Sequence, residues 1–139
     1  MPISLSISHE LRRVVVVVEG EGTLVEGLKV LAQIFAAGAL PYAKLLDFSF
    51  ARPEEGAAAI RKLSQFVGRF VRGKTPGPLA FVARSELVKD MILLFEQQIR
   101  PEIGGPRPMK IFADAASAAA WLDELQAEAL AQVQDKKAG

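Results

Sequence analysis

The sequence contains no cysteine and only one histidine, His9, among its 139 residues. The absence of cysteine excludes disulfides, thiolate metal ligands and cysteine nucleophiles. With a single histidine, most zinc sites and Ser-His-Asp triads lack the residues that they need. Neither sign of charge is in excess, since 17 basic and 16 acidic residues leave a net charge of +1. We therefore expect no general attraction to nucleic acid or to anionic membranes.

Long hydrophobic runs are missing as well. The valine run at residues 14–18 has only five members and is followed by Glu19. A signal-peptide core needs about 7–15 apolar residues, and a membrane helix needs about 20. We therefore expect no signal peptide, no membrane insertion and a cytoplasmic location.

Hydrophobic residues nevertheless make up 50% of the chain, and charged residues make up 24%. A folded chain of this length buries roughly 68–70% of the surface that it exposes when unfolded, which is enough for a substantial core. We expect a single domain over residues 1–132 and a frayed tail over residues 133–139.

Strand and helix patterns alternate along the chain. Strands are predicted at residues 3–7, 12–19, 43–48, 79–83 and 109–112. Helices are predicted to start at Thr23, Pro53, Ser85 and Asp114, and to end near Gly38, Gly73, Arg100 and Gln132. Helical crossovers between strands imply parallel pairing. The sequence thus predicts an α/β fold with a mixed sheet, an N-terminal antiparallel hairpin and about four helices.

Two glycine patterns resemble phosphate-binding loops. Residues 68–75 match the Walker A expression, but Gly68 lies inside a predicted helix instead of between a strand and a helix. We interpret this stretch as a helix C-terminus. Residues 20–23 do join a strand to a helix, but the third glycine of a dinucleotide fingerprint is replaced by Val25. We interpret them as a tight turn, and we expect no cofactor.

No catalytic constellation is apparent. Asp47 is predicted at the carboxyl end of a strand, where ligand sites of α/β proteins usually lie, but no base or nucleophile can be placed beside it. Hydrogen bonding to the following loop is the simpler role for Asp47. His9, in the first turn, is interpreted as a surface residue. We expect the protein not to be an enzyme and to hold no metal.

Positive charge is concentrated on one predicted helix. Residues 56–85 contain no acid, and four bases of this segment fall within one third of the helix circumference. They are Arg61, Lys62, Arg69 and Arg72. This basic face is either a solvated helix face or a docking face for an acidic protein or an anionic surface. Nucleic acid is not expected, because no exposed aromatic residues are interleaved with the bases.

Leu93 lies on the polar side of the helix that begins after Ser85. Single exposed leucines are common in monomeric proteins. The alternative is a contact in a homodimer, and both interpretations remain open.

Three stretches carry a resemblance to a known family. They are residues 14–20 followed by Thr23, residues 44–49 (Lys-Leu-Leu-Asp-Phe-Ser), and residues 111–114 with residues 118–122. Together they resemble the SpoIIAA-like branch of the STAS domains, a bacterial group also described as STAS/SEC14-like. The resemblance implies a small mixed sheet surrounded by helices, and a regulatory or ligand-sensing domain without catalysis.

The resemblance would imply a phosphorylated serine in the turn that follows the predicted strand at residues 43–48 and opens the next helix, as in anti-anti-sigma factors. Residues 51–56 of this chain contain no hydroxyl there, and Ser49 lies on the strand end. Control by a kinase is therefore not expected from this segment.

The SEC14-like side of the resemblance implies instead a pocket for an apolar ligand. Candidate lining residues are Asp47, Phe48, Ser49, Phe50, Phe66, Phe70, Met91 and Phe95. The aromatic residues among them would also fit an ordinary core. The leading hypothesis is a non-enzymatic regulatory domain that works by contact with a protein, and the alternative is a carrier of a small apolar ligand or lipid.

Overall fold

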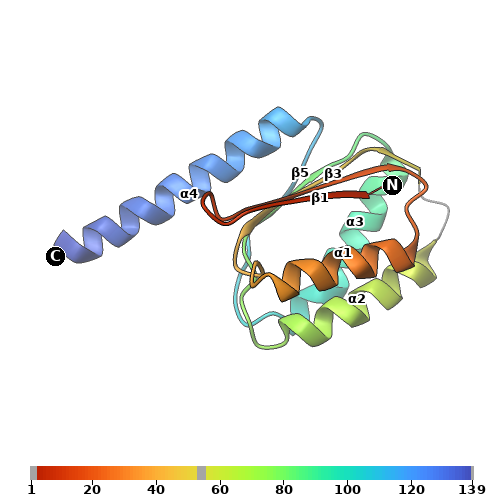
Figure 1. Ribbon diagram of the computed structural model, residues 1–139, viewed down its shortest axis with the longest axis horizontal. Coiled ribbons are helices and arrows are strands. Elements are labelled where there is room, and N and C mark those ends of the chain that lie inside the picture. Colours follow the sequence, from red (N-terminus) through yellow and green to blue (C-terminus); the bar gives the residue numbers. More distant parts are fainter. Residues whose placement is uncertain (1–2, 53–55, 139) are drawn as a thin grey trace.

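The computed structural model describes residues 3–52 and 56–138. Its elements follow one another along the chain in the predicted alternation (Figure 1). They are β1 (Ile3–Ser8), β2 (Arg13–Gly20), α1 (Leu24–Ala36), β3 (Ala43–Ala51), α2 (Ala57–Val71), β4 (Leu79–Val82), α3 (Glu86–Ile99), the 3-10 helix η1 (Arg100–Glu102), β5 (Met109–Phe112) and α4 (Ala115–Ala138).

The strands form one sheet in the order β1-β2-β3-β4-β5. β1 pairs antiparallel with β2, so the predicted hairpin is confirmed. The other three pairings are parallel, because a helix separates each of these strands from the next. The mixed α/β architecture expected from the sequence is therefore the one observed.

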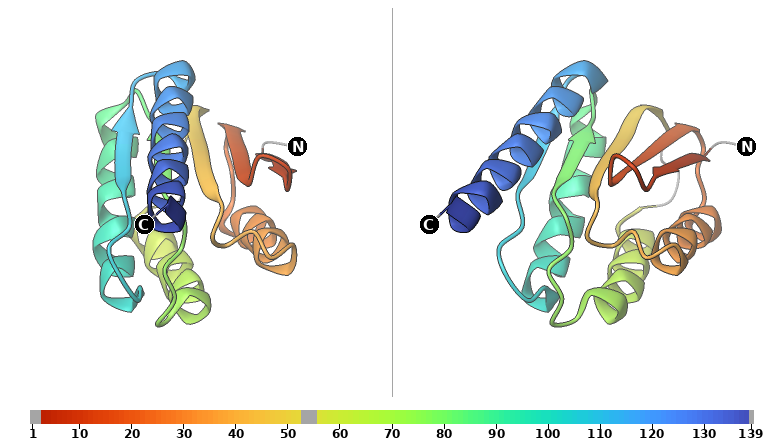
Figure 2. Two further views of the ribbon diagram at one scale, coloured as in Figure 1. Left: turned by 90° about the vertical axis from the view of Figure 1, so that its left-hand side faces the viewer. Right: turned by 60° about the vertical axis from the view of Figure 1, so that its left-hand side comes forward.

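Helices cover both faces of this sheet. α1, α2 and α3 lie on one face, and α4 crosses the other (Figures 1 and 2). Side chains alternate along each strand, so that Leu45 packs toward Ala118 and Leu122 of α4, whereas Leu46 packs toward the three-helix layer. Two apolar cores result, one on each face of the sheet.

The start of α1 is closed by side chains, as its sequence predicts. The backbone N–H of Glu26 donates to the Thr23 hydroxyl at 3.2 Å, and the Thr23 N–H donates to the Glu26 carboxylate at 3.3 Å. This capping box satisfies two amides that the helix itself leaves unpaired. The chain leaves α1 through Gly38, whose φ of 70° is favourable only for glycine.

Two boundaries on either side of the β3–α2 connection differ from the prediction. β3 continues to Ala51 instead of ending at Phe48, because β2 still pairs with it beyond a register shift. α2 begins at Ala57, after an N-cap at Gly56. Pro53, the predicted start of that helix, lies outside the described residues.

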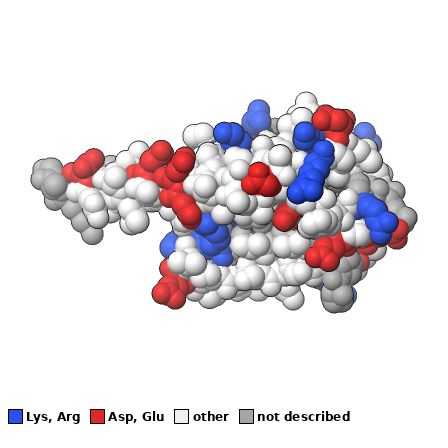
Figure 3. Space-filling model, turned by 90° about the horizontal axis from the view of Figure 1, so that it is seen from above, with Lys and Arg blue, Asp and Glu red and all other residues white. Residues whose placement is uncertain are grey.

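α4 is longer than predicted. Its first half packs on the sheet and buries Ala118 and Leu122 completely. Residues 127–135 are all exposed, and Leu130 has 63% of its surface accessible. The helix continues through Ala138, where the sequence predicted a frayed tail, and its end projects from the body with acidic side chains along it (Figure 3).

Within residues 3–52 and 56–138, no helix combines the length and the apolar character that crossing a membrane requires.

Candidate functional site

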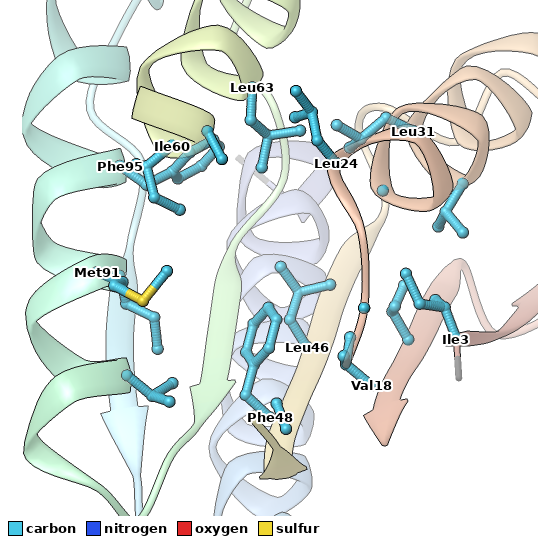
Figure 4. Close-up of a pocket in the computed structure, with 18 of the residues that line it drawn as sticks. Ile3, Val18, Leu24, Leu31, Leu46, Phe48, Ile60, Leu63, Met91 and Phe95 are labelled. Atoms are coloured by element: carbon cyan, nitrogen blue, oxygen red, sulfur yellow. The ribbon is translucent and has the colours of Figure 1, made fainter. Parts of the chain in front are cut away.

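An apolar cavity of about 230 Å³ lies between the sheet and the layer formed by α1, α2 and α3 (Figure 4). The strands supply its floor, with Val18 from β2 and Leu46 and Phe48 from β3. The helices supply its walls. Their labelled side chains, Leu24 and Leu31 of α1, Ile60 and Leu63 of α2, and Met91 and Phe95 of α3, border the same space in Figure 4.

The cavity walls are almost entirely apolar. Among the described residues that line the cavity, Thr23 alone has a polar side chain, and its hydroxyl caps α1. A charged or strongly polar group placed inside would lose its hydration without finding a partner, which costs several kcal/mol. The interior is therefore suited to hydrocarbon.

Gly27 contributes to the empty space. It lies in the second turn of α1 and lines the cavity, and a Cβ built on it would lie 3.9 Å from Cδ1 of Leu63. Glycine inside a helix is unfavourable by roughly 0.5–1 kcal/mol relative to alanine. At this position a larger side chain would occupy the space between α1 and α2.

One end of the cavity lies at the carboxyl edge of the parallel strands. The lining residues there are Gly20 at the end of β2, Ala51 at the end of β3, Thr23 at the start of α1 and Ala59 in the first turn of α2. Two strand ends and two helix N-termini therefore meet at this end. In open α/β sheets this is the edge at which ligands usually bind.

Three of the eight predicted pocket residues line the cavity, namely Phe48, Met91 and Phe95. Asp47 and Ser49 do not, because they alternate with Phe48 along β3 and point to the other face of the sheet. Asp47 also lies four residues before the end of its strand. Its carboxylate accepts a hydrogen bond from the Ser49 backbone N–H at 2.9 Å.

Phe50 is absent from the lining because of a β-bulge. Val17 pairs with Asp47 and Glu19 pairs with Phe50, so two residues of β3 lie opposite Val18 alone. The extra residue reverses the alternation, which turns Ala51 into the cavity and Phe50 away from it. Phe50 is 61% exposed.

Phe66 and Phe70 belong to a separate aromatic cluster. The Phe70 ring stacks on Phe35 with a centroid distance of 4.3 Å, and the Phe66 ring lies 5.0 Å from that of Phe70. This cluster joins the C-terminal halves of α1 and α2, and neither Phe66 nor Phe70 lines the cavity.

The sequence analysis missed most of the cavity lining. Val16, Val18, Leu24, Leu31, Ile60 and Leu63 all line it. Val16 and Val18 are buried core residues, and the four helical residues are partly buried. A periodicity pattern shows which face of a helix or strand is buried. It does not show whether an unfilled space remains between the helices and the sheet that they cover.

The predicted basic face borders a second, polar groove between α2 and the end of α3. This groove has a volume of about 440 Å³ and is lined by Arg61, Arg69 and Arg72, but not by Lys62. The Nε of Arg72 lies 3.1 Å from a carboxylate oxygen of Glu102, so one of these charges is already paired. Gly68 lines the groove without a side chain, and a Cβ added there would lie only 3.3 Å from Cγ of Glu102.

Gly68 lies inside α2, which ends at Val71, and Gly73 follows with a φ of 71°. The Walker-like stretch is thus a helix C-terminus, as its position in the sequence indicated.

Leu93 is 52% exposed on α3 and belongs to none of the hydrophobic core clusters formed by the described residues. His9 is exposed too, but its Nδ1 lies 2.7 Å from the Tyr42 hydroxyl, which ties the hairpin turn to the segment before β3. Within the part of the chain that the structure describes, no three His, Asp or Glu side chains gather as metal ligands would.

A buried charged cluster lies at the opposite, amino edge of the parallel strands. Arg107 and Glu96 form an ion pair in which the side chains are only 3% and 4% exposed. Lys44, at the start of β3, donates from its ammonium group to the carbonyls of Leu40 and Tyr42. Burial, with a smaller contribution from the charge of Arg107, lowers the pKa of Lys44 from 10.5 to about 7.

No family model matches this chain, and no curated protein matches it either. Among solved structures, it is similar to an uncharacterized protein of the DUF3478 family with a SpoIIAA-like fold, from Shewanella loihica PV-4. The TM-score is 0.57, the sequence identity is 18%, and the match covers 86% of this chain and 91% of the other. The chain therefore has a SpoIIAA-like fold.

Proposed function

We propose that the protein is a non-enzymatic binding domain that holds a small apolar molecule between its sheet and the α1–α3 layer. The observation that carries this proposal is the apolar cavity of about 230 Å³. Ligand sites are concave, largely preformed and lined mainly by hydrophobic side chains, with few polar groups. The cavity has each of these properties.

The energetic argument points the same way. The space is partly open, so its apolar walls are accessible to water, and covering apolar surface is favourable by roughly 25 cal/mol per Å². An apolar ligand that fills the space would remove these walls from water and stabilise the folded state.

The absence of chemistry in the lining supports a binding role over catalysis. The hydroxyl of Thr23, the polar side chain among the described lining residues, already accepts the Glu26 amide of the capping box. Acid-base or nucleophilic catalysis needs a pair of polar groups within hydrogen-bond reach of the reacting atom. The walls of this cavity supply hydrocarbon contact instead.

Native mass spectrometry of the protein purified from its own host tests the proposal. The expected result is a species heavier than the chain by the mass of a small molecule, which extraction with organic solvent removes. Refolded protein stripped of that molecule should then bind a fluorescent apolar dye, and the extract should displace it. A protein that carries nothing and binds no dye contradicts the proposal.

Contact with an acidic protein is the second candidate function, and the basic face carries it. Arg61, Arg69 and Arg72 converge on one groove, and among the described residues that line it Glu102 alone carries a carboxylate. Such a groove is complementary to an acidic helix or loop, and complementary charge mainly increases the rate and specificity of association.

Reversal of the three arginines to glutamate separates this role from a simple solvated face. The R61E/R69E/R72E variant should lose an acidic protein that the wild type captures from the host. The K29E/R84E/K110E variant is the control, since it changes the net charge equally at exposed positions outside the groove. Equal loss in both variants would show an effect of net charge alone.

A further inference from the structure

We infer that the acidic partner of the groove on α2 is a second copy of this chain, whose projecting helix α4 lies antiparallel along α2. This inference rests on the second candidate function, because it concerns the same groove. It assigns the partner, the segment of the partner that binds, and the residues that meet.

The projecting half of α4 carries an acidic edge. Residues 123–135 contain four acids and no base, and the next lysines follow at 136 and 137. At about 100° per residue, three of these acids fall within about 40° of one another on the helix surface. They are the exposed residues Glu124, Glu128 and Asp135. Ala131 lies beside them, and its short side chain would allow another helix to approach closely.

The acidic edge has no counter-charge within its own chain. Asp123 is paired with Arg13, at 3.0 Å between Oδ1 and Nη2. Among the described residues, no base lies within ion-pair distance of the three acids of the edge. Glu124 and Glu128 are four residues apart, a spacing at which like charges on a helix repel each other. A cationic surface that covers the edge would therefore be favourable.

The groove on α2 offers such a surface. Arg61 and Arg69 are exposed, and no carboxylate of the described residues lies within ion-pair distance of either. Arg72 donates to Glu102 through its Nε, so its two terminal nitrogens remain available to another carboxylate. Gly68 lines the groove between these arginines without a side chain. A helix with a small residue at its centre can therefore lie close to α2.

The spacing of the charges on the two helices selects the antiparallel direction. Three opposite charges then meet across the contact: Arg61 with Asp135, Arg69 with Glu128, and Arg72 with Glu124. At about 1.5 Å per residue, the outer two pairs are level, and the middle pair differs by only about 1.5 Å along the axis. In the parallel direction Arg69 would lie about 6 Å from the level of Glu128 and would face Gln132 instead.

This contact is heterologous, because a helix of one copy binds a groove of another. Within one copy, α4 and α2 lie on opposite faces of the sheet, so both surfaces are open to neighbouring copies (Figure 2). Exposed ion pairs are individually weak. We therefore expect weak self-association that increases with protein concentration and decreases with salt.

Light scattering at increasing protein concentration tests this contact. At low ionic strength the average mass of wild type should rise above that of a single chain. At about 1 M salt, where the Debye length is about 3 Å, it should return to that of a single chain. The R61E/R69E/R72E variant should associate at least about tenfold more weakly, because like charges would then face each other.

A charge exchange within the middle pair locates the contact. R69E and E128R should each weaken association by about threefold to tenfold, since each places like charges together. The R69E/E128R double variant has the net charge of wild type and restores opposite charges across the contact, so it should associate within about twofold of wild type. R69E/E21R is the matched control. It has the same net charge, but Glu21 is an exposed residue outside both surfaces, so association should stay weak.

A wild-type protein that remains a single chain at every concentration, while R61E/R69E/R72E still loses an acidic protein of the host, would overturn the inference and leave the second candidate function intact. Equal recovery in R69E/E128R and R69E/E21R would overturn it as well, because net charge alone would then govern association. Absence of both self-association and an acidic partner would contradict the second candidate function itself.

Discussion

The two ends of the space beneath α1–α3 are held together in different ways. β3 contributes Lys44, Leu46 and Phe48 to this face, and the surroundings of its side chains change from charged to apolar between Lys44 and Phe48. At the Lys44 end, two hydrogen bonds from Lys44 and the Glu96–Arg107 ion pair hold the charged groups to defined partners. At the Phe48 end, apolar contacts surround an unfilled volume. The comparison indicates a rigid amino edge that supports an adaptable carboxyl edge, because apolar contacts have no preferred direction.

The largest effect is expected at the charged end. Glu96→Ala would leave the Arg107 guanidinium buried without its counter-charge, and breaking such a pair typically costs 3–5 kcal/mol. Urea unfolding should show this loss. Glu86→Ala removes a partner of the exposed Lys89 pair and serves as the control, with an expected loss below about 0.5 kcal/mol. Similar losses in the two variants would mean that the buried pair does not hold this end.

A pH-dependent effect at the same end comes from Lys44. Its folded-state pKa of about 7 lies below its unfolded value of 10.5, so between these values the unfolded chain binds more protons. Stability should therefore rise from pH 7 toward pH 10, by about 2 kcal/mol up to pH 9. Below pH 7 both states are protonated, and the cost of burying the charge is present in full.

The Lys44→Met variant isolates this contribution. Its stability should lack that rise when urea unfolding is compared with wild type at pH 6.5, 8 and 9. A parallel rise in both proteins would assign the pH dependence to other groups.

A smaller effect is expected at the apolar end. Thr23→Ala removes the hydroxyl that accepts the Glu26 amide, and loss of such a cap costs about 1 kcal/mol. Without this cap the first turn of α1, which borders the cavity at Thr23, should open more often, and hydrogen exchange of its amides should be faster. Unchanged exchange in this turn would show that packing alone holds the start of α1.

The parts of the fold that depend on neighbouring residues could be predicted from the sequence. The alternation of Ile3, Leu5 and Ile7 indicated the hairpin, and the spacing of Thr23 and Glu26 indicated the start of α1. The helices between successive strands indicated parallel pairing, whereas the strand order and the face that each helix covers were not predicted.

Features that depend on distant residues could not be predicted. Glu96 and Arg107 lie on different elements from Lys44, and no local pattern marks them as partners. The bulge opposite Val18 arises from the pairing of two strands, so the sequence of one strand could not show that Phe50 turns away from the cavity. The cavity depends on how far α1 stands from α2 at Gly27, which no single helix pattern contains.

The most direct test of the binding site is a substitution that places a larger side chain inside the cavity. Gly27→Leu should place a side chain in the cavity beside Leu63, whereas Gly27→Ala adds only a Cβ at an ordinary contact distance. Both substitutions remove a helical glycine, so both should stabilise the fold by roughly 0.5–1 kcal/mol.

The measurement is the affinity of both variants for decanol, an uncharged probe with one alkyl chain, read together with their urea unfolding. The account predicts that Gly27→Ala binds decanol within about threefold of wild type, whereas Gly27→Leu is folded and binds it at least about tenfold more weakly, since the chain and the new side chain compete for one space. A folded Gly27→Leu protein that binds decanol as tightly as Gly27→Ala would contradict the claim that this cavity is the binding site.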